Sequence, residues 1–278
     1  RKTAAALLLT TAMGVQGETR EVVIDGAMGR LRGEVTVPEG ISEGQKVPTV
    51  IIFHGFTGNR RETIHSTLAD SLSRRGMAVV RFDFNAHGES DGEFVRMSID
   101  NELEDARRIY TYTRSLPFAG KIGLVGHSQG GVITILLSAE LGAGSVGGIA
   151  LLAPALIIHD AMIQGCCFGT IFNPLDVPSE VSLFGGRLTI GRDYILSGQR
   201  MQPWKAARSY EGRVCIVHGT GDTAVPYSYS ELLSDIYRQA ELHILDRADH
   251  TYTGVEDQPA HIVTEWMRQV LGTSGQQE

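Results

Sequence analysis

The stretch Gly126-His127-Ser128-Gln129-Gly130 indicates both the fold and the chemistry of this chain. This G-x-S-x-G pattern stands between an apolar run at 121–125, typical of a buried strand, and a helix-like apolar run at 131–137. A serine on such a sharp strand-to-helix turn is held in a strained backbone conformation that exposes its hydroxyl at the end of the sheet. Glycines flank it because side chains there would collide where the helix folds back over the strand. The stretch therefore predicts that Ser128 is a nucleophile.

A serine hydroxyl is a weak nucleophile and needs a base and an orienting acid. On this kind of turn the partners follow the serine in the order Asp or Glu, then His. An apolar strand at 213–218 is followed by a loop that contains Asp222, and a strand at 241–245 is followed by a loop that contains His250. We expect these loops to leave the sheet at the same edge as the serine, so that Ser128, Asp222 and His250 form a catalytic triad.

Other acids and histidines compete for these two roles. The chain has nine histidines, so the argument for His250 is its place in the loop after the last predicted strand. Asp246 and Asp249 are the rival acids, but they lie too close in sequence to His250 for the usual triad geometry. Asp222 is therefore the predicted acid.

The tetrahedral intermediate of acyl transfer needs hydrogen-bond donors for its oxyanion. One predicted donor is the backbone N–H of Gln129, directly after the nucleophile. The second is the N–H of Phe56, in the loop after an apolar strand at 50–53. We expect the Phe56 side chain to form a wall of the pocket, and His54 to fasten the loop rather than to transfer protons.

Composition and motifs argue against several other classes of protein. The 278 residues carry a net charge of −7 and 42% hydrophobic residues, enough for one large α/β domain. The sequence has no basic stripe for nucleic acid, no apolar run of about 20 residues that could span a bilayer, and no P-loop or dinucleotide-binding motif. The three cysteines, Cys166, Cys167 and Cys215, form neither a disulfide framework nor a metal-ligand spacing. We therefore expect no cofactor and no metal.

Residues 1–17 differ in character from the rest of the chain. Arg1-Lys2 precedes an apolar stretch at 4–9 and a run of small residues that ends at Gly17. This order is typical of an export signal, and an ordinary first helix is the alternative. The signal, or its remnant, predicts a secreted or periplasmic protein whose catalytic domain occupies residues 18–278.

From residue 47 onward, apolar strands alternate with helical patterns. Strands are expected at 50–53, 78–82, 122–125, 148–152, 214–217 and 242–245, after a hairpin at 21–24 and 31–37. Helices are expected at 62–75, 99–115, 131–141, 228–239 and 259–271. Near-continuous apolar strands alternating with helices imply an α/β fold with a mostly parallel sheet that is covered on both faces.

One long segment, about residues 155–203, shows no βα unit. Loops of this length inside compact domains are usually functional. The segment carries several large apolar and aromatic side chains, Met162, Phe168, Phe172, Phe184 and Tyr194. We expect it to be a small lid over the catalytic edge that forms the acyl side of the pocket, and its apolar content argues against a disordered insertion.

With Ser128, Asp222 and His250 in this order, the chain resembles the α/β-hydrolase superfamily. Its motifs look like those of bacterial feruloyl (cinnamoyl) esterases at 54–58, 82–92, 126–131, 153–155 and 218–226. The resemblance extends over about residues 21–271. The segment between Pro154 and Pro203 also looks like the small lid of that family.

The resemblance implies an α/β-hydrolase fold and hydrolysis of ferulate, p-coumarate and caffeate esters, which are often attached to plant cell-wall polysaccharide. It also implies that the polar lid residues Asp160 and Tyr194 reach the phenolic hydroxyl, although both could be ordinary surface residues. General short-chain carboxylesterases and monoacylglycerol-type lipases share several of the motifs and are the alternative enzymes. A hydrolase-fold protein that only binds its ligand is the alternative outside enzymes. A homodimer is left open.

Overall fold

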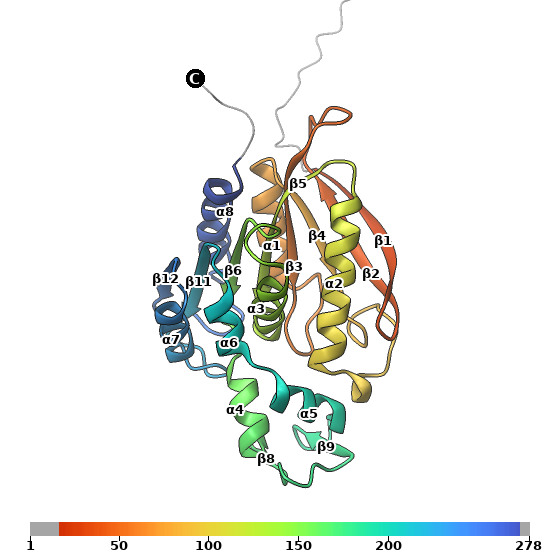
Figure 1. Cartoon of the computed structure of the whole chain (residues 1–278), viewed down its shortest axis with the longest axis vertical. Helices are drawn as coiled ribbons and strands as arrows, with labels where there is room; N and C mark the ends of the chain where they lie inside the picture. The colour runs from red at the N-terminus through yellow and green to blue at the C-terminus, as the bar shows by residue number, and fades with distance from the viewer. Residues whose placement is uncertain (1–16, 273–278) are drawn as a thin grey trace, which may run out of the picture.

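The computed structural model describes residues 17–272, which are built around one eight-stranded sheet (Figure 1). Its strands are β1 (Glu18–Gly26), β2 (Gly29–Val37), β3 (Val47–Phe53), β4 (Ala78–Phe82), β5 (Ala119–His127), β6 (Gly148–Leu152), β11 (Val214–Gly219) and β12 (Ala240–Leu245). They lie in the order β1-β2-β4-β3-β5-β6-β11-β12. Strand β2 pairs antiparallel with β1 and β4, and the remaining pairs are parallel. The mostly parallel sheet expected from the sequence is confirmed.

Helices cover both faces of this sheet. The helices that follow strands are α1 (Thr63–Arg74), α2 (Ile99–Ser115), α3 (Gln129–Leu141), α7 (Ser228–Ile236) and α8 (Asp257–Leu271), and a short 3₁₀ turn, η1 (Phe94–Arg96), precedes α2. Helices α1 and α8 pack against each other on one face, and α2 and α3 pack together on the other. The ends of these helices and of the strands differ from the sequence prediction by at most three residues.

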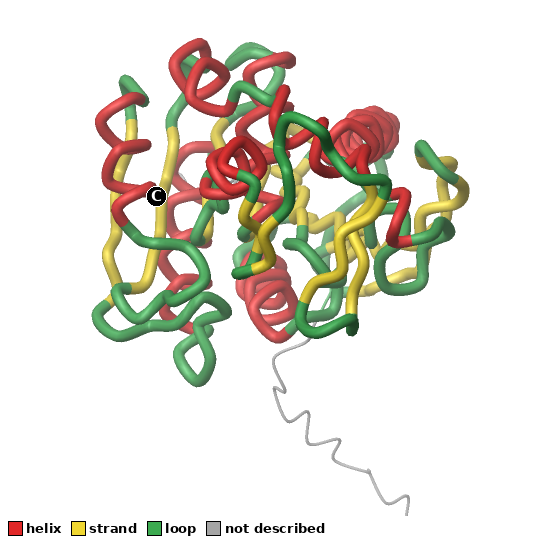
Figure 2. Tube along the Cα trace, turned by 90° about the horizontal axis from the view of Figure 1, so that it is seen from below, coloured by secondary structure: helices red, strands yellow, loops and turns green. Residues whose placement is uncertain are grey.

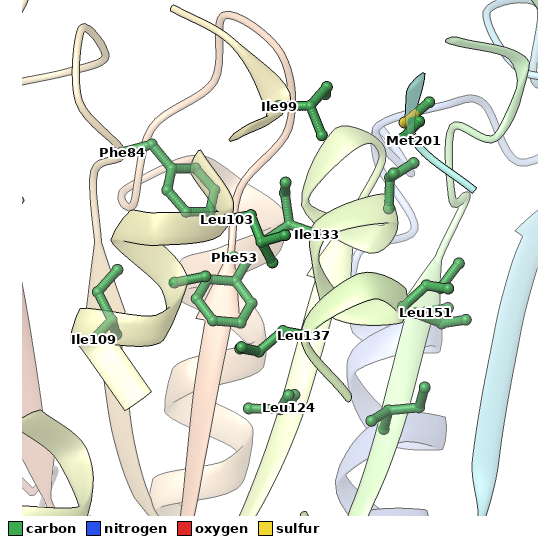
Figure 3. Packing of buried hydrophobic residues seen from close by; sticks show 14 of the residues in the cluster. Phe53, Phe84, Ile99, Leu103, Ile109, Leu124, Ile133, Leu137, Leu151 and Met201 are labelled. Atoms are coloured by element: carbon green, nitrogen blue, oxygen red, sulfur yellow. The ribbon is translucent and has the colours of Figure 1, made fainter. Parts of the chain in front are cut away.

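Strand β3 shows why the buried strands read as continuous apolar runs. Successive side chains of a strand point to opposite faces. Ile52 therefore joins the hydrophobic cluster under α1 and α8, whereas Phe53 joins the cluster under α2 and α3. Figure 3 shows Phe53 beside Leu103 of α2 and Ile133 of α3. Both faces are buried, so the strand is apolar at every position except Thr49, whose hydroxyl donates to the carbonyl oxygen of Val47.

The insertion between β6 and β11 is an ordered small subdomain. It contains α4 (Ile157–Gln164), β7 (Cys166–Cys167), β8 (Thr170–Ile171), β9 (Glu180–Leu183), β10 (Leu188–Gly191), α5 (Arg192–Arg200) and α6 (Pro203–Ser209). Strands β7 and β8 form one hairpin, and β9 and β10 form another. Helix α6 packs on α3 and α7 beside the sheet, and the rest of the subdomain lies below the sheet in Figure 1 and toward the viewer in Figure 2. The sequence predicted its place but none of its helices and hairpins.

Two further expectations concern the export signal and membrane-spanning segments. Residues 1–16 of the predicted export signal lie outside the described residues. Between residues 17 and 272, none of the helices combines the length and the apolar character needed to cross a bilayer.

Candidate active site

Ser128 lies on the turn between β5 and α3 with a strained backbone, φ 55° and ψ −120°. The two flanking positions are glycine because a side chain at either would collide with the backbone, as the sequence suggested. A Cβ on Gly126 would lie 2.1 Å from the carbonyl oxygen of Gly130, and a Cβ on Gly130 would lie 2.3 Å from the carbonyl oxygen of Phe53. Both distances are far below contact, so only glycine fits where the helix crosses back over β3 and β5.

The structure brings the three predicted triad residues together. The Ser128 hydroxyl lies 2.9 Å from His250 Nε2, and His250 Nδ1 lies 2.6 Å from Asp222 Oδ2. Because Asp222 can only accept, His250 carries its proton on Nδ1 and presents the Nε2 lone pair to the serine. This is the arrangement in which an imidazole can remove the serine proton.

The two rival acids are engaged elsewhere. Asp246 pairs with Arg247 at the surface. Asp249 accepts hydrogen bonds from the backbone N–H groups of Thr251 and Thr253, so it shapes the loop that carries His250. Neither carboxylate orients the imidazole.

The Asp222 carboxylate is held ionised by four hydrogen bonds. Its Oδ1 accepts from the backbone N–H groups of Ala224 and Val225, both at 2.8 Å. Its Oδ2 accepts from His250 and from Nε2 of His218 at 3.1 Å. Burial alone would raise the pKa of Asp222, but the hydrogen bonds from the two histidines and Val225 outweigh it and hold the pKa well below its usual range.

His218 is a positioning residue that the sequence reasoning missed. It is fully buried, and its Nε2 faces two acceptors, Asp222 Oδ2 and the carbonyl oxygen of Val225 at 3.0 Å. Nε2 must therefore carry the proton, and in the neutral ring Nδ1 accepts from the Ser230 hydroxyl at 2.6 Å. The signal was present as a histidine at the end of β11, four residues before the predicted acid.

The predicted oxyanion donors lie on both sides of the serine. Gln129 is the first residue of α3, where backbone N–H groups have no partner within the helix. Phe56 lies in the turn after β3, and no backbone acceptor for its N–H is found among the described residues. A Cβ on Gly55 would lie 2.8 Å from Ser128 Cβ, so glycine there lets this turn approach the nucleophile. The arrangement allows both N–H groups to bind the oxyanion.

His54 fastens the turn that carries Phe56, as expected. Its Nδ1 donates to the carbonyl oxygen of Gly55 at 2.8 Å, and its Nε2 accepts from the backbone N–H of Phe84 at 2.9 Å. Burial, together with nearby His87, lowers the pKa of His54 well below its ordinary value. A buried neutral imidazole with both nitrogens occupied has no role in proton transfer.

Tyr194 lines the cavity, as expected. Its hydroxyl, which we expected to reach the phenolic hydroxyl of the substrate, bonds to another side chain instead. The hydroxyl donates to Gln129 Oε1 at 2.6 Å, and Gln129 Nε2 donates to Glu102 Oε2 at 2.8 Å. All three side chains are buried. Burial raises the pKa of Glu102 to about 8. The Tyr194 hydroxyl thus braces the residue that follows the nucleophile, while its ring packs 5.5 Å from the ring of Phe56.

Tyr194→Phe should therefore slow hydrolysis of large and small esters alike. The substitution leaves Gln129 Oε1 buried without its donor, at a cost of about 1–3 kcal/mol. We expect kcat/KM for methyl ferulate and for p-nitrophenyl acetate to fall by similar factors, and the melting temperature to fall by a few degrees. Steady-state kinetics and calorimetry measure both. A loss confined to methyl ferulate would restore the role expected from the sequence, a contact with the phenolic ring.

A cavity of about 450 Å³ opens at Ser128 and runs under the lid. Its walls are mostly apolar and include Phe56, Ile158 and Phe168, with the rings of Phe56 and Phe168 stacked at 5.6 Å. Asp160 also lines it and accepts from the Tyr229 hydroxyl at 2.5 Å. Burial, together with this hydrogen bond, raises the pKa of Tyr229 to about 12.

The cysteines of the lid are both free and both line the cavity. Cys166 is exposed, and Cys167 is buried. Burial, with Cys166 beside it, raises the pKa of Cys167 to about 12, so this thiol stays protonated and unreactive.

A strained serine between strand and helix, an oriented imidazole and two backbone N–H groups without a partner among the described residues are features of serine hydrolases with the α/β-hydrolase fold. Residues 44–175 match the Hydrolase_4 family model, described as serine aminopeptidase S33. Est1E from Butyrivibrio proteoclasticus, in a structure with ferulic acid bound, is 29% identical, with a TM-score of 0.83 over 88% of this chain and 96% of that chain. The resemblance to bacterial feruloyl esterases is thus confirmed.

Other similar proteins are a further solved structure and two curated relatives. XC6422 from Xanthomonas campestris, an α/β serine hydrolase without a lid, is 19% identical with a TM-score of 0.65 over 98% of this chain and 100% of that chain. The uncharacterized protein YfhR of Salmonella typhi is 26% identical over 73% of this chain. An uncharacterized 31.7 kDa protein of the traX-finO intergenic region of Escherichia coli is 34% identical over 34% of it. The chain spans 64% and 32% of the lengths of these two curated relatives.

Proposed function

We propose that this protein hydrolyses esters of hydroxycinnamic acids, ferulate, p-coumarate and caffeate, through an acyl-enzyme on Ser128. The observation that carries the proposal is the mostly apolar cavity at the nucleophile, which is also lined by the hydrogen-bonded pair Asp160 and Tyr229. Likeness to Est1E, which binds ferulic acid, supports it. The alcohol side would be a small molecule or a cell-wall polysaccharide, and the predicted export signal fits a substrate outside the cell.

The reaction follows from the geometry at Ser128. His250 takes the hydroxyl proton through Nε2 as the serine oxygen attacks the ester carbonyl. The N–H groups of Gln129 and Phe56 stabilise the oxyanion, and Asp222 stabilises the imidazolium. His250 then gives the proton to the leaving alcohol. Water, activated by the same imidazole, hydrolyses the acyl-enzyme and releases the acid.

The lid supplies the recognition of the acyl group. The rings of Phe56 and Phe168 offer faces on which an aromatic acid can stack. Asp160 and the oxygen of the Tyr229 hydroxyl, whose proton is donated to Asp160, offer acceptors for a ring hydroxyl. A site that hydrogen-bonds a substrate hydroxyl discriminates against the analogue that lacks it.

A substrate panel tests the proposal. We expect kcat/KM to be higher for methyl ferulate and methyl p-coumarate than for p-nitrophenyl acetate and a monoacylglycerol. Faster turnover of the short ester would favour a general carboxylesterase, and preference for the glyceride would favour a lipase. Binding of ferulate without hydrolysis of any ester would indicate a binding protein.

Asp160→Ala should remove the preference for a hydroxylated ring. We expect kcat/KM for methyl p-coumarate to fall roughly tenfold or more, equivalent to about 1–3 kcal/mol, while methyl cinnamate, which has no ring hydroxyl, is nearly unaffected. Asp176→Ala, at an exposed position of the same lid, is the matched control. Equal losses on both esters would show that Asp160 supports only the shape of the lid.

A further inference from the structure

Three acceptor atoms converge behind the nucleophile, outside the cavity for the ester. They come from Glu62, His65 and His127, whose possible ligand atoms all lie within 4.8 Å of one another. The buried atoms of this group are Glu62 Oε2, His65 Nε2 and His127 Nδ1. Among the described residues none of the three atoms has a hydrogen-bond partner, although all three are buried. Glu62 precedes the first turn of α1, His65 lies on that turn, and His127 ends β5 directly before Ser128. We call these residues the Glu62–His65–His127 cluster.

The other nitrogen of each imidazole fixes where its lone pair points. His65 Nδ1 lies 3.1 Å from the carbonyl oxygen of Asn59, and His127 Nε2 lies 2.9 Å from the carbonyl oxygen of His250. A carbonyl oxygen can only accept, so both of these nitrogens carry the proton. His65 Nε2 and His127 Nδ1 therefore carry lone pairs, and Glu62 Oε2 lies 3.4 Å from the other nitrogen of His65, Nδ1.

Three buried acceptors without hydrogen-bond partners are unfavourable unless something positive or hydrogen-donating reaches them. One water molecule can donate only two hydrogen bonds, which leaves one acceptor unsatisfied. A metal cation satisfies all three lone pairs at once.

We propose that Glu62, His65 and His127 bind one divalent transition-metal ion, for which Zn²⁺ is the best match. Two imidazoles and one carboxylate are a ligand set that Zn²⁺ uses with a water in the fourth position. Two ligand atoms on one zinc ion lie at most about 4.2 Å apart. The possible ligand atoms here lie within 4.8 Å of one another, so the side chains need to approach by about half an ångström. The Glu62 side chain is 32% exposed and can rotate inward to do so. Mg²⁺ and Ca²⁺ fit less well because they prefer oxygen ligands.

The surroundings have the features of a prepared site. Each imidazole donates its other N–H to a backbone carbonyl, the outer contact that metal-binding histidines usually make. A surface cavity of about 270 Å³, lined by Glu62 and Glu256 among others, gives an ion an acidic path from solvent. The loop before α1 is anchored by Arg60, whose backbone N–H donates to the buried Asp83 at 2.7 Å.

The position of the cluster predicts what the ion does. It would join α1 to the strand that carries the nucleophile. Through His127 Nε2–H it would also hold the carbonyl oxygen of His250, the triad base. The ion would touch neither Ser128 nor the ester, so its role is to brace the loop of the base.

Metal binding by the unmodified chain is the first test. Tag-free protein is treated with chelator, dialysed and titrated with Zn²⁺ in a calorimeter, and with Co²⁺ while the visible spectrum is recorded. We expect one ion per chain and an increase in melting temperature with Zn²⁺. With Co²⁺ we expect the intense visible absorption bands of an ion with a low coordination number. Anomalous scattering at the zinc edge from soaked crystals should place the ion between the three side chains.

Matched variants separate this site from chance binding at the surface. Glu62→Gln and His65→Gln should each weaken Zn²⁺ binding about tenfold or more, because each removes a ligand atom. Cys166→Ser and His261→Gln remove an exposed thiol and an exposed imidazole elsewhere, and should leave the affinity unchanged.

The proposal is overturned if the chain binds less than one ion, or if Glu62→Gln and His65→Gln bind as tightly as the unmodified protein. In either case a proton on Glu62, shared with the two imidazoles, would be what occupies the cluster. If both variants fail to fold, the anomalous map of the unmodified protein decides alone. Zinc found at Cys166 or at the surface, and not between the three side chains, also refutes the site.

Discussion

Ser128→Ala abolishes ester hydrolysis and leaves the fold intact: this is the largest effect we expect from one substitution. The hydroxyl is the only group in the proposed mechanism that carries the acyl chain, and it contacts His250 Nε2 at 2.9 Å. Loss of the nucleophile of such a triad lowers kcat by about 10⁴- to 10⁶-fold. The rate that remains comes from the oxyanion donors and from binding. Hydrolysis of methyl ferulate, followed by chromatography of the released acid, measures the loss.

The same variant should retain its stability and its ligand. Alanine removes one oxygen and has the same Cβ as serine, so the strained backbone at φ 55° is unchanged. We expect the melting temperature to stay within about two degrees and ferulate to bind with normal affinity. Ser209→Ala, at an exposed position of α6, serves as the control for handling and purity. Substantial activity in a clean Ser128→Ala preparation would refute the mechanism.

The sequence predicted the triad because alternation of strands and helices has a fixed geometric consequence. Loops that follow parallel strands meet at one edge, so Ser128, Asp222 and His250 could be placed together without any knowledge of their contacts. The strand-to-helix turn was equally readable, since Gly126 and Gly130 have no room for a Cβ. These predictions depend on local pattern and chain order alone.

Contacts between distant side chains could not be read in this way. The bond between Tyr194 and Gln129 joins residues 65 positions apart, and the pair Asp160–Tyr229 joins residues 69 positions apart. The elements of the lid were also missed, because two-residue strands such as β7 and β8 have no period to detect. The polar partners of a buried group are decided by packing, and a single sequence does not show packing.

The Glu62–His65–His127 cluster is an intermediate case. The spacing Glu-x-x-His places two ligands on one turn of α1, which a sequence does show. The third ligand comes from β5 and is brought near only by the fold. A mixed set of Glu and His on two elements follows neither a cysteine spacing nor a known zinc motif, so no local pattern indicates it.

Asp222→Asn should lower kcat by about 10⁴-fold, and here it should also destabilise the protein. If the amide nitrogen takes the place of Oδ2, it faces the Nε2–H of His218, a donor against a donor. It would also force His250 to accept at Nδ1 and carry its proton on Nε2, where it cannot take the proton of Ser128. The base is then in the wrong tautomer.

The opposite orientation of the amide fails for a different reason. With the oxygen toward His250, the NH₂ group faces the backbone N–H groups of Ala224 and Val225, which the carboxylate accepts at 2.8 Å. The partly buried N–H of Val225 and the exposed N–H of Ala224 would lose their acceptor. We expect a cost of about 1–3 kcal/mol and a movement of the loop at 223–225 that lines the cavity. Neither orientation of an amide satisfies all four donors around Asp222.

We therefore expect Asp222→Asn to combine a collapse of kcat with a fall of several degrees in melting temperature, a pairing that Ser128→Ala does not show. Asp246→Asn and Asp249→Asn are the matched controls, since both acids lie near His250 in sequence and contact other partners. Kinetics on methyl ferulate and differential scanning calorimetry of the four variants make the comparison. Greater damage from either control than from Asp222→Asn would move the acid of the triad to that residue. Normal stability with lost activity would mean that the loop at 223–225 adapts to the amide, and that the carboxylate matters only for the tautomer and charge of His250.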